Sequence, residues 1–225
     1  MAAAQAGDRV AYDTLLRDCL PFIAGIARRQ GVPPESIDDV VQRTELETLS
    51  LVPATINLAG AEIELVSGLS RETRLRQALA PVASRYDFVL IDCPPALSML
   101  TLNGLCAAHG VIIPMQCEYY ALEGLSDLAN TIKKVSANLN PDLKIVGLLR
   151  VMFDPRMTLS QQVSDQLEQH FGDKVFKTLI PRNVRLAEAP SYGIPGVVFD
   201  PSSKGAQAYI AFGAEMVERI KQLDK

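Results

Sequence analysis

The alternation of short apolar runs with helical stretches after residue 43 constrains the fold of this chain more than any other feature of its sequence. The apolar runs predict strands at residues 49–54, 88–93, 110–116, 144–153, 174–181 and 196–200. Helical patterns near residues 59–66, 71–83, 97–107, 120–138 and 158–171 separate them, and an amphipathic helix follows Pro201 with Ser202 as its predicted N-cap. Because continuous apolar strands separated by helices are typical of a parallel sheet covered on both faces, the sequence predicts an α/β fold.

The first 43 residues follow a different pattern. Between Ala11 and Arg29, apolar residues recur at three- and four-residue steps, which predicts a helix with a kink at Pro21. The sequence GVPPES ends this helix, and Pro34 suits the first turn of a second helix that continues through SIDDVVQ. We therefore expect an α-helical pair at residues 1–43, with no strand between its helices, followed by the α/β domain at residues 44–225.

Composition excludes several classes of protein. The 225 residues are enough for one sizeable domain with a small appendage, and a hydrophobic content of 48% argues against disorder. A net charge of −4 means that any DNA contact requires a local basic patch. No run approaches the length of a membrane span and no signal peptide is present, so we expect a cytoplasmic protein. The four cysteines form no CxxC pair and predict free buried thiols: Cys19, Cys93, Cys106 and Cys117. His109 and His170 lie far from any partner with metal-ligand spacing, so we expect both at the surface or at a helix end.

The stretch YDFVLIDCPP, residues 86–95, carries the first chemical signal. A buried strand that ends in Asp92 has the Walker B arrangement, in which the carboxylate holds a Mg²⁺-bound water. Pro94 and Pro95 hold the following segment extended, as a nucleotide-sensing switch requires. The alternative is that Asp92 is an ordinary turn residue. Since ligands bind at the carboxyl ends of parallel strands, we expect one edge of the sheet to carry Asp92, Gln116 and residues 181–183.

From about Thr44 onward the chain resembles the ParA/Soj family of chromosome- and plasmid-partition ATPases. The matching stretches are LVPATINLAGAEIELV, YDFVLIDCPPALSMLTLNGL, IPMQCEYYALEGLSDL, TLIPRNVRLAEAPSYGIP and DPSSKGAQAY. The related MinD and nitrogenase iron-protein families share the fold and the aspartate motif but lack QCEYYALEG and PRNVRLAEAPS. The resemblance implies a P-loop NTPase-like fold of the deviant Walker class.

The resemblance also implies roles for individual residues. Asp92 would lie beside the Mg²⁺ of bound ATP, and Pro94 and Pro95 would open the switch. Residues 116–124, which begin with Gln116, would lie near the nucleotide and the dimer surface. The segment that would lie against the adenine base consists of Pro181, Arg182 and Asn183.

Arg156 and Arg185 match family positions that present positive charge to DNA, and Lys204 would extend that surface. Members of the family contact the phosphate backbone of DNA as ATP-bound homodimers. They work with a ParB-type partner and associate with the nucleoid. A few separated basic residues suit contacts with phosphates that do not depend on sequence. The alternative for each arginine is an ordinary solvated side chain.

The phosphate-binding loop of the family is absent from this sequence. Nothing matches GxxxxGK[ST] or KGGxGK[ST], and the nearest fragments, FGDKV and SSKGA, are a helix end and a cap. We therefore predict no measurable ATPase activity for this chain. The first strands of the family are also expected to be missing, which would leave the strand at 88–93 without a neighbour, because two helices cannot supply parallel-strand hydrogen bonds.

The opening residues have a resemblance of their own. AQAGDRVAYDTLLRDCLPFIAGIARRQGVPPESIDDVVQ resembles the start of region 2 of extracytoplasmic-function sigma factors, which implies contact with RNA polymerase through residues 1–43. An unrelated capping hairpin is the alternative. Four interpretations remain open for the whole chain: a partition ATPase with impaired nucleotide chemistry, a non-enzymatic remnant that binds DNA or a partner, a sigma-like RNA polymerase-binding fusion, and a chain that joins two reading frames.

Overall fold

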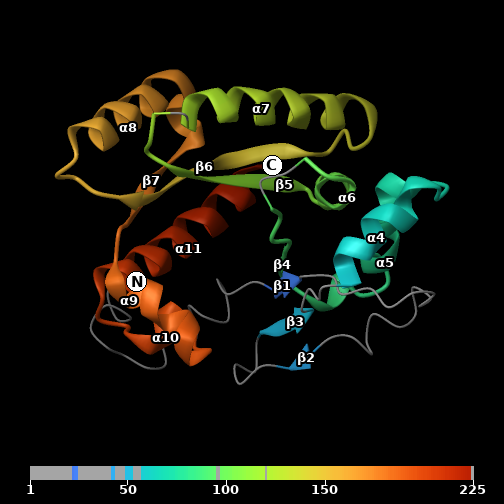
Figure 1. The fold of residues 1–225 in the computed structure, drawn as a ribbon, viewed down its shortest axis with the longest axis horizontal. Coiled ribbons are helices and arrows are strands. Elements are labelled where there is room, and N and C mark those ends of the chain that lie inside the picture. The colour runs from blue at the N-terminus through green and yellow to red at the C-terminus, as the bar shows by residue number, and fades with distance from the viewer. Residues whose placement is uncertain are drawn as a thin grey trace. The chain divides into compact units, whose positions relative to one another are not determined.

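The computed structural model describes residues 22–24, 42–43, 49–52, 57–94, 97–119 and 121–223 (Figure 1). The chain divides into two compact units. The first consists of Met1–His109 with Lys134–Leu143, and the second of Gly110–Lys133 with Lys144–Lys225. Each unit has a sheet of its own, and each is described by itself.

The sheet of the first unit has the order β2-β3-β1-β4. Its strands are β1 (Phe22–Ala24), β2 (Gln42–Arg43), β3 (Ser50–Val52) and β4 (Val89–Leu90). Strand β1 runs parallel to both β3 and β4, and β2 pairs with β3 in the antiparallel sense. The helical elements are α4 (Asn57–Val66), η2 (Arg71–Thr73), α5 (Arg74–Leu79), η3 (Ala83–Arg85) and α6 (Met99–Ala107).

Strand β1 corrects two expectations. Residues 22–24 were expected inside a helix but form a strand, and β4 was expected to lack a neighbour but pairs with β1 through Phe22–Val89 and Ile23–Leu90. A short apolar run such as FIA suits either conformation, and the unpaired N–H and C=O groups of a strand edge favour the partner that satisfies them. The other residues of the expected helical pair lie outside the described ranges, apart from Gln42 and Arg43 of β2.

Two buried asparagines fasten the helices of the first unit to one another. Asn103 of α6 accepts a hydrogen bond from the Leu75 N–H at 3.1 Å and donates to the Arg71 carbonyl at 2.8 Å. Asn140 donates to the carbonyls of Leu105 and Ala108, at 2.9 and 2.8 Å. Each side-chain amide bonds backbone groups that have no backbone partner at a loop or helix end. These backbone groups and the buried amides are therefore all hydrogen-bonded.

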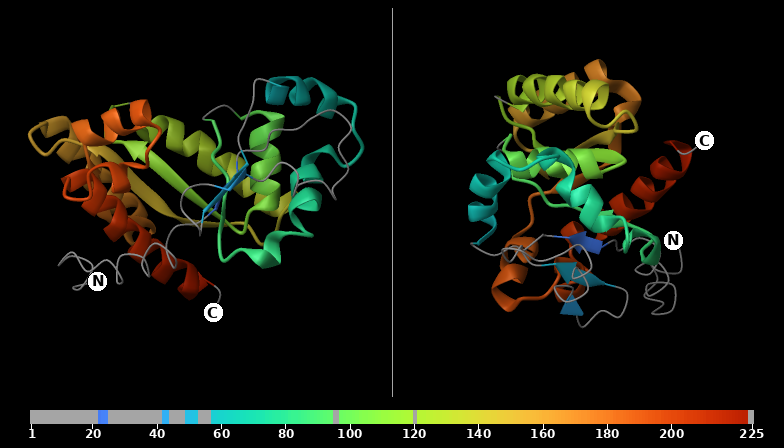
Figure 2. Two further views of the ribbon diagram at one scale, coloured as in Figure 1. Left: turned by 90° about the horizontal axis from the view of Figure 1, so that it is seen from below. Right: turned by 90° about the vertical axis from the view of Figure 1, so that its right-hand side faces the viewer.

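The sheet of the second unit is parallel and has the order β5-β6-β7. Its strands are β5 (Gly110–Gln116), β6 (Lys144–Phe153) and β7 (Val175–Pro181), within one residue of their expected bounds. Helices α7 (Ala121–Asn138) and α8 (Thr158–Phe171) lie over one face and α11 (Lys204–Leu223) lies over the other, as Figures 1 and 2 show. This arrangement confirms the expected α/β class. The core between the layers includes Leu148, Leu149, Leu167, Phe176 and Met216.

The short elements around β7 and the start of α11 differ from the prediction in two places. They are η4 (Gly172–Lys174) before β7, then α9 (Val184–Glu188), η5 (Ala189–Tyr192) and α10 (Gly196–Phe199) after it. The strand expected at 196–200 is wrong, because this apolar run lies between Pro195 and Pro201, packs against α11 and pairs with none of the described strands. The N-cap of α11 is Ser203, whose Oγ accepts from the Ala206 N–H at 3.2 Å, and not Ser202.

The described residues also bear on the membrane and thiol expectations. Within them, no helix combines the length and the apolar character needed to cross a membrane. Cys106 and Cys117 are buried free thiols, as expected, and burial raises the pKa of both. Cys93 is also a free thiol but is exposed. The two buried thiols are therefore poor nucleophiles.

Candidate nucleotide and nucleic-acid site

Asp92 lies just beyond the carboxyl end of β4 in the first unit. Asp92 and Pro94 are both exposed, and Pro95 lies outside the described residues. Partial burial, followed by the negative charge of Asp92, raises the pKa of the neighbouring Cys93 thiol. An exposed carboxylate at a strand end can hold Mg²⁺ through a water molecule, which is the way Mg²⁺ is commonly bound beside phosphates.

The remaining candidate residues all belong to the second unit. Gln116 is the last residue of β5, pairs with Val151 of β6 and has an exposed side chain. Its carbonyl accepts from the Glu118 N–H at 2.9 Å, which begins the turn toward α7. The next carbonyl, that of Cys117, accepts from the Ser160 hydroxyl at 3.3 Å. The end of β5 is therefore tied to the start of α8.

The expected adenine segment is held at both of its ends. Pro181 pairs with Phe153, and the Arg182 N–H donates to the Phe153 carbonyl at 3.0 Å. Asn183 is the N-cap of α9, and its Oδ1 accepts from the Leu186 N–H at 3.2 Å. This cap uses the side-chain oxygen of Asn183 and leaves its amide NH₂ group as the donor available to a ligand.

Arg156 is fixed by an acidic partner at the end of β6. Its Nε and Nη2 donate to the two carboxylate oxygens of Asp154 at 2.9 and 2.7 Å, and its backbone N–H donates to Oδ1 at 3.0 Å. These hydrogen bonds, with a smaller contribution from the charge of Arg182, lower the pKa of Asp154 to about 2. The Arg156 side chain is nonetheless 86% exposed, so its remaining N–H groups face solvent.

Arg185 has two acidic partners. Its Nη1 donates to Glu188 at 3.0 Å, its Nε donates to Asp200 at 3.1 Å, and its guanidinium lies 5.8 Å from the centroid of the Phe199 ring. Lys204, the first residue of α11, is exposed, and its side chain makes no hydrogen bond or ion pair with the described residues. The two arginines are therefore neither freely solvated nor buried. They are exposed cations held in ion pairs.

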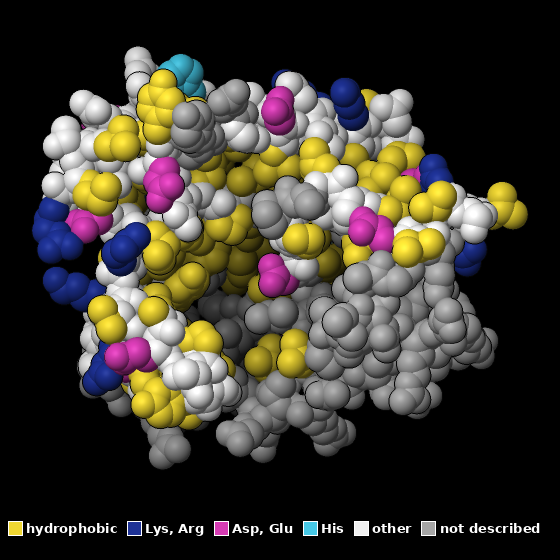
Figure 3. Space-filling model, viewed as in Figure 1, with side chains coloured by type: hydrophobic (Ala, Val, Ile, Leu, Met, Phe, Trp, Pro, Cys, Tyr) yellow, Lys and Arg dark blue, Asp and Glu magenta, His cyan; other side chains and the backbone are white. Residues whose placement is uncertain are grey.

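Figure 3 shows Lys and Arg side chains along the side of the second unit where β6 and β7 end, with acidic side chains between them. The local charge is mixed, in keeping with the ion pairs of Arg156 and Arg185. A surface of this kind attracts a polyanion only weakly while the carboxylates stay paired with Arg156 and Arg185.

Each unit by itself offers candidate ligand groups. In the first unit, Asp92 suits a water-mediated Mg²⁺ contact. In the second unit, residues 181–183 present a fixed backbone and an amide donor. Among the residues described, no group of three or more His, Cys, Asp or Glu side chains could hold a metal directly. The glycine-rich loop with lysine that would wrap the phosphates does not occur in the sequence.

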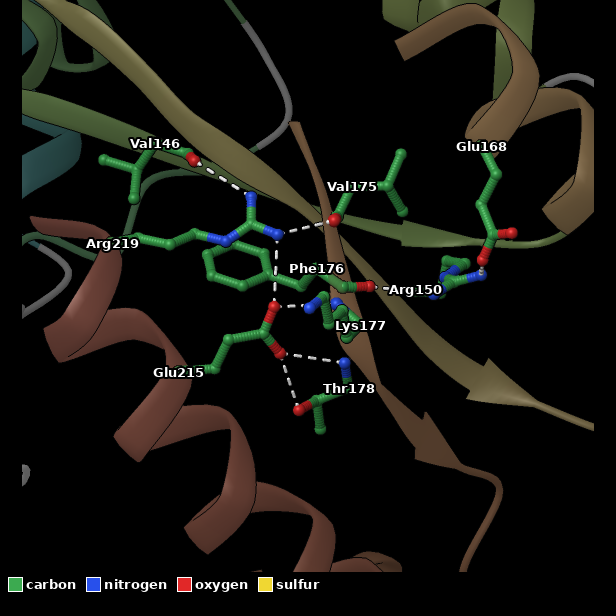
Figure 4. Close-up of polar contacts among 9 residues, drawn as sticks. All are labelled: Val146, Arg150, Glu168, Val175, Phe176, Lys177, Thr178, Glu215 and Arg219. Atoms are coloured by element: carbon green, nitrogen blue, oxygen red, sulfur yellow. Dashed lines mark hydrogen bonds and ion pairs between the residues drawn. The ribbon is translucent and has the colours of Figure 1, made fainter. Parts of the chain in front are cut away.

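Four charged residues that were not predicted as functional form hydrogen bonds and ion pairs around β7 (Figure 4). They are Arg150 of β6, Glu168 of α8, and Glu215 and Arg219 of α11. Two signals point to them: a charged residue within the apolar run KIVGLLRVMF, and an acid–base pair four residues apart on the last helix.

Comparisons with known proteins decide the family. A family model described as an AAA domain matches residues 27–145. The sporulation initiation inhibitor protein Soj of Bacillus subtilis is 52% identical over 185 residues, which cover 82% of this chain and 73% of Soj. The chain belongs to the ParA/Soj family. The chromosome partitioning protein ParA of Myxococcus xanthus is also 52% identical, over 183 residues that cover 81% of this chain and 65% of that protein.

Solved structures agree with the ParA/Soj assignment at the level of the fold. Cobyrinic acid a,c-diamide synthase from Mycobacterium smegmatis, solved with an ATP analog and magnesium, has a TM-score of 0.71 and 32% identity, covering 94% of this chain and 91% of that one. The cell division ATPase MinD of Pyrococcus furiosus has a TM-score of 0.64 at 17% identity, covering 94% and 90%. The P-loop NTPase-like fold is therefore established for this ParA/Soj-family chain.

The match to the ParA/Soj family has two limits. The chain spans between 59% and 74% of the length of the curated relatives it matches, and 73% of Soj and 65% of ParA. The family model begins at residue 27, within the segment that resembles a sigma factor. The sigma-factor resemblance, and the contact with RNA polymerase that it implies, remain predictions.

Proposed function

We propose that this chain acts in chromosome or plasmid partitioning by binding DNA through its phosphates, as a dimer that works with a ParB-type partner. The observation that carries the proposal is that Arg156, Arg185 and Lys204 all present exposed cationic groups in a chain that belongs to the ParA/Soj family. Arg156 follows β6, Arg185 lies in α9, and Lys204 begins α11.

Binding would proceed by exchange of ion-pair partners. A DNA phosphate that approaches Arg185 replaces the exposed Glu188, and an exposed ion pair contributes little to stability, so this exchange costs little. A phosphate that approaches Arg156 competes with Asp154, which holds the arginine through three hydrogen bonds and opposes the exchange. Lys204 needs no exchange. Each phosphate contact releases a counterion, so three contacts give a salt dependence with a slope of roughly −0.9 per contact, and no dependence on base sequence.

The experiment is fluorescence anisotropy with two labelled duplexes of unrelated sequence, over a range of salt. We expect equal affinities for the two duplexes, and a weaker affinity and shallower salt slope after Arg156→Ala, Arg185→Ala and Lys204→Ala are combined. Lys133→Ala is the matched control, an exposed lysine of α7 that is outside the proposed surface. Unchanged binding by the triple variant would contradict the proposal.

For nucleotide, we propose contacts by individual residues but no hydrolysis. Asp92 would hold Mg²⁺ through water, Pro94 and Pro95 would form the switch, Gln116 would lie near the nucleotide, and residues 181–183 would contact adenine. The metal would supply charge neutralisation at the phosphates. The sequence contains no glycine-rich lysine loop to cradle those phosphates, so we expect weak binding and no hydrolysis by this chain alone.

Steady-state phosphate release from the pure protein tests the nucleotide proposal. We expect release equal to the blank for both the parent chain and Asp92→Ala. Release above the blank that Asp92→Ala abolishes would show that the chain hydrolyses ATP. Binding of a fluorescent ATP analogue, measured in parallel, separates a chain that binds ATP without hydrolysis from a non-enzymatic DNA- or partner-binding module.

A further inference from the structure

The ladder between β6 and β7 is irregular next to the expected adenine segment. Leu148 pairs with Val175, and the next pair is Arg150 with Leu179. Over this step β6 advances two residues (148 to 150), while β7 advances four (175 to 179). Residues 176–178 of β7 therefore form a bulge, whose backbone groups need partners other than the ladder.

Side chains of α11 bind one face of this bulge (Figure 4). The Glu215 carboxylate accepts from the N–H groups of Lys177 and Thr178 at 2.7 and 2.9 Å, and from the Thr178 hydroxyl at 2.8 Å. Arg219 donates to the Val175 carbonyl at 2.6 Å and to Glu215 at 3.1 Å. A single acid–base pair thus satisfies two N–H groups of the bulge and the carbonyl of the residue before it.

The opposite face is held by β6 itself. Arg150 is 4% exposed, and its Nη2 donates to the Phe176 carbonyl at 2.8 Å. Its Nη1 donates to the Ser164 hydroxyl at 2.8 Å and forms an ion pair with Glu168, both of α8. The bulge is therefore held by specific hydrogen bonds from two elements rather than by apolar packing alone.

The Glu215–Arg219 pair is largely enclosed. The two side chains are 18% and 17% exposed, and the Arg219 guanidinium lies 4.2 Å from the centroid of the Phe176 ring. Burial by itself would raise the pKa of Glu215, but the hydrogen bonds from residues 177 and 178 and the charge of Arg219 lower it. Glu215 is therefore a charged acceptor, which makes stronger hydrogen bonds than a neutral one.

The β7 bulge contributes to the register at which β7 ends. If pairing were regular after Leu148–Val175, Phe153 would face Ile180, but its observed partner is Pro181. The bulge adds two residues to β7, and a second irregularity takes one back, because between Arg150 and Phe153 β6 advances three residues while β7 advances two. The net one-residue shift turns the side chains at this end of β7 to the opposite face, relative to regular pairing. Without the bulge, Pro181 and the residues after it would leave the sheet at a different register.

The other end of α11 contacts the same segment. A Cβ on Gly205 would lie 2.6 Å from Leu186 Cδ1 and 3.0 Å from Asn183 Cβ, so the helix approaches α9 and its N-cap closely enough to require glycine. Helix α11 thus contacts β7 through Glu215 and approaches Asn183, two residues after β7, at Gly205.

We propose that Glu215 is a positioning residue: by holding the β7 bulge, it fixes the register at which residues 181–183 leave the sheet toward the nucleotide. The inference rests on the proposed function for the identity of the ligand, and on the hydrogen bonds of α11 for the positioning itself. In the absence of these bonds, β7 relaxes toward regular pairing and the Arg182 N–H loses its place opposite the Phe153 carbonyl.

The test compares Glu215→Gln with Glu218→Gln, which removes the same charge from an exposed site on the same helix. A glutamine accepts one of the two N–H groups and turns its own NH₂ toward the other. Amide hydrogen exchange by NMR is the main measurement. We expect the Arg182 amide to exchange on the order of tenfold faster in Glu215→Gln than in Glu218→Gln, while the Asn103-bound Leu75 amide is unchanged.

An unchanged Arg182 amide in a folded Glu215→Gln protein would overturn the inference. If Glu215→Gln fails to fold, Thr178→Val removes only the hydroxyl bond, and a smaller but selective increase in Arg182 exchange is expected. Equal exchange in Thr178→Val and the parent chain would then count against the inference.

Nucleotide binding separates this inference from the proposed function. Competition between ATP and GTP for a fluorescent ATP analogue should show a preference for ATP that Glu215→Gln reduces and Glu218→Gln does not. A parent chain without preference for ATP contradicts the adenine role of residues 181–183. The exchange result then still decides whether Glu215 sets their register.

Discussion

Asp154 holds Arg156 through three hydrogen bonds at the carboxyl end of β6, two from the guanidinium and one from the backbone. The acid is 13% exposed and the arginine 86%, so the pair places a cation on the surface at a fixed position. Arg156, a predicted DNA contact, is thus restrained by Asp154, which was not among the predicted site residues.

Removal of this acid should strengthen DNA binding. Asp154→Asn keeps the size of the side chain but frees the charge of Arg156 for phosphate. We expect affinity for a labelled duplex to rise by about twofold to tenfold at low salt, with a steeper salt slope. Asp165→Asn, which neutralises an exposed carboxylate of α8, is the control for the change in net charge. Equal gains in both variants would show that the pair is irrelevant.

The same pair should make stability depend on pH in the acid range. The pKa of Asp154 falls from 3.8 to about 2 on folding, so its contribution is complete above 3.8 and is lost as pH falls toward 2. The urea midpoint of Asp154→Asn should therefore approach that of the parent chain as pH decreases through this window. A difference that stays constant with pH would show that Asp154 does not titrate in this way.

Buried Arg150 should be costly to replace alone. Arg150→Ala leaves the Phe176 carbonyl and the Glu168 carboxylate without their partner, and we expect a loss of about 3–5 kcal/mol in urea unfolding. Combining Arg150→Met with Glu168→Met should recover part of that loss, because no unpaired charge remains. Losses that simply add in the double variant would indicate that the two residues do not interact.

Two glycines should respond in opposite directions. Gly205→Ala places a Cβ 2.6 Å from Leu186 Cδ1, so we expect a loss of about 1–3 kcal/mol. Gly124→Ala, in α7, meets nothing within 4 Å and should gain up to about 1 kcal/mol from helix propensity. Thermal unfolding measures both. Adding Leu186→Ala to Gly205→Ala should restore part of the loss, and its failure to do so would locate the strain elsewhere.

Met152 should tolerate glycine unusually well. It has a φ of 53°, a left-handed conformation that costs a side-chain-bearing residue about 1–2 kcal/mol. Met152→Gly removes this strain but adds about 0.5–1 kcal/mol of chain entropy, so stability should be unchanged or slightly higher. Val151→Gly, one residue earlier in β6, should lower stability clearly. Equal losses in the two variants would contradict the strain at Met152.

Strands and site residues differed in how far the sequence could predict them. β5, β6 and β7 were predictable because long apolar runs between helices have few alternatives. The strand expected at 196–200 became α10, and residues 22–24 became β1, because a short apolar run adopts whatever conformation its neighbours satisfy. Motif matches made Asp92 and residues 181–183 candidate site residues, but they could not show that the side-chain oxygen of Asn183 caps a helix.

The sequence by itself determined the α/β class, the ParA/Soj resemblance and the absence of a glycine-rich lysine loop, because these depend on local periodicity and on short motifs. The tertiary structure alone decided the ion pairs of Arg156 and Arg185, the strand beside β4 and the bulge of β7. Glu215 binds backbone groups 38 and 37 residues earlier in the chain, and Arg150 binds a carbonyl 26 residues later. Such contacts follow from which elements pack together, and no local pattern encodes them.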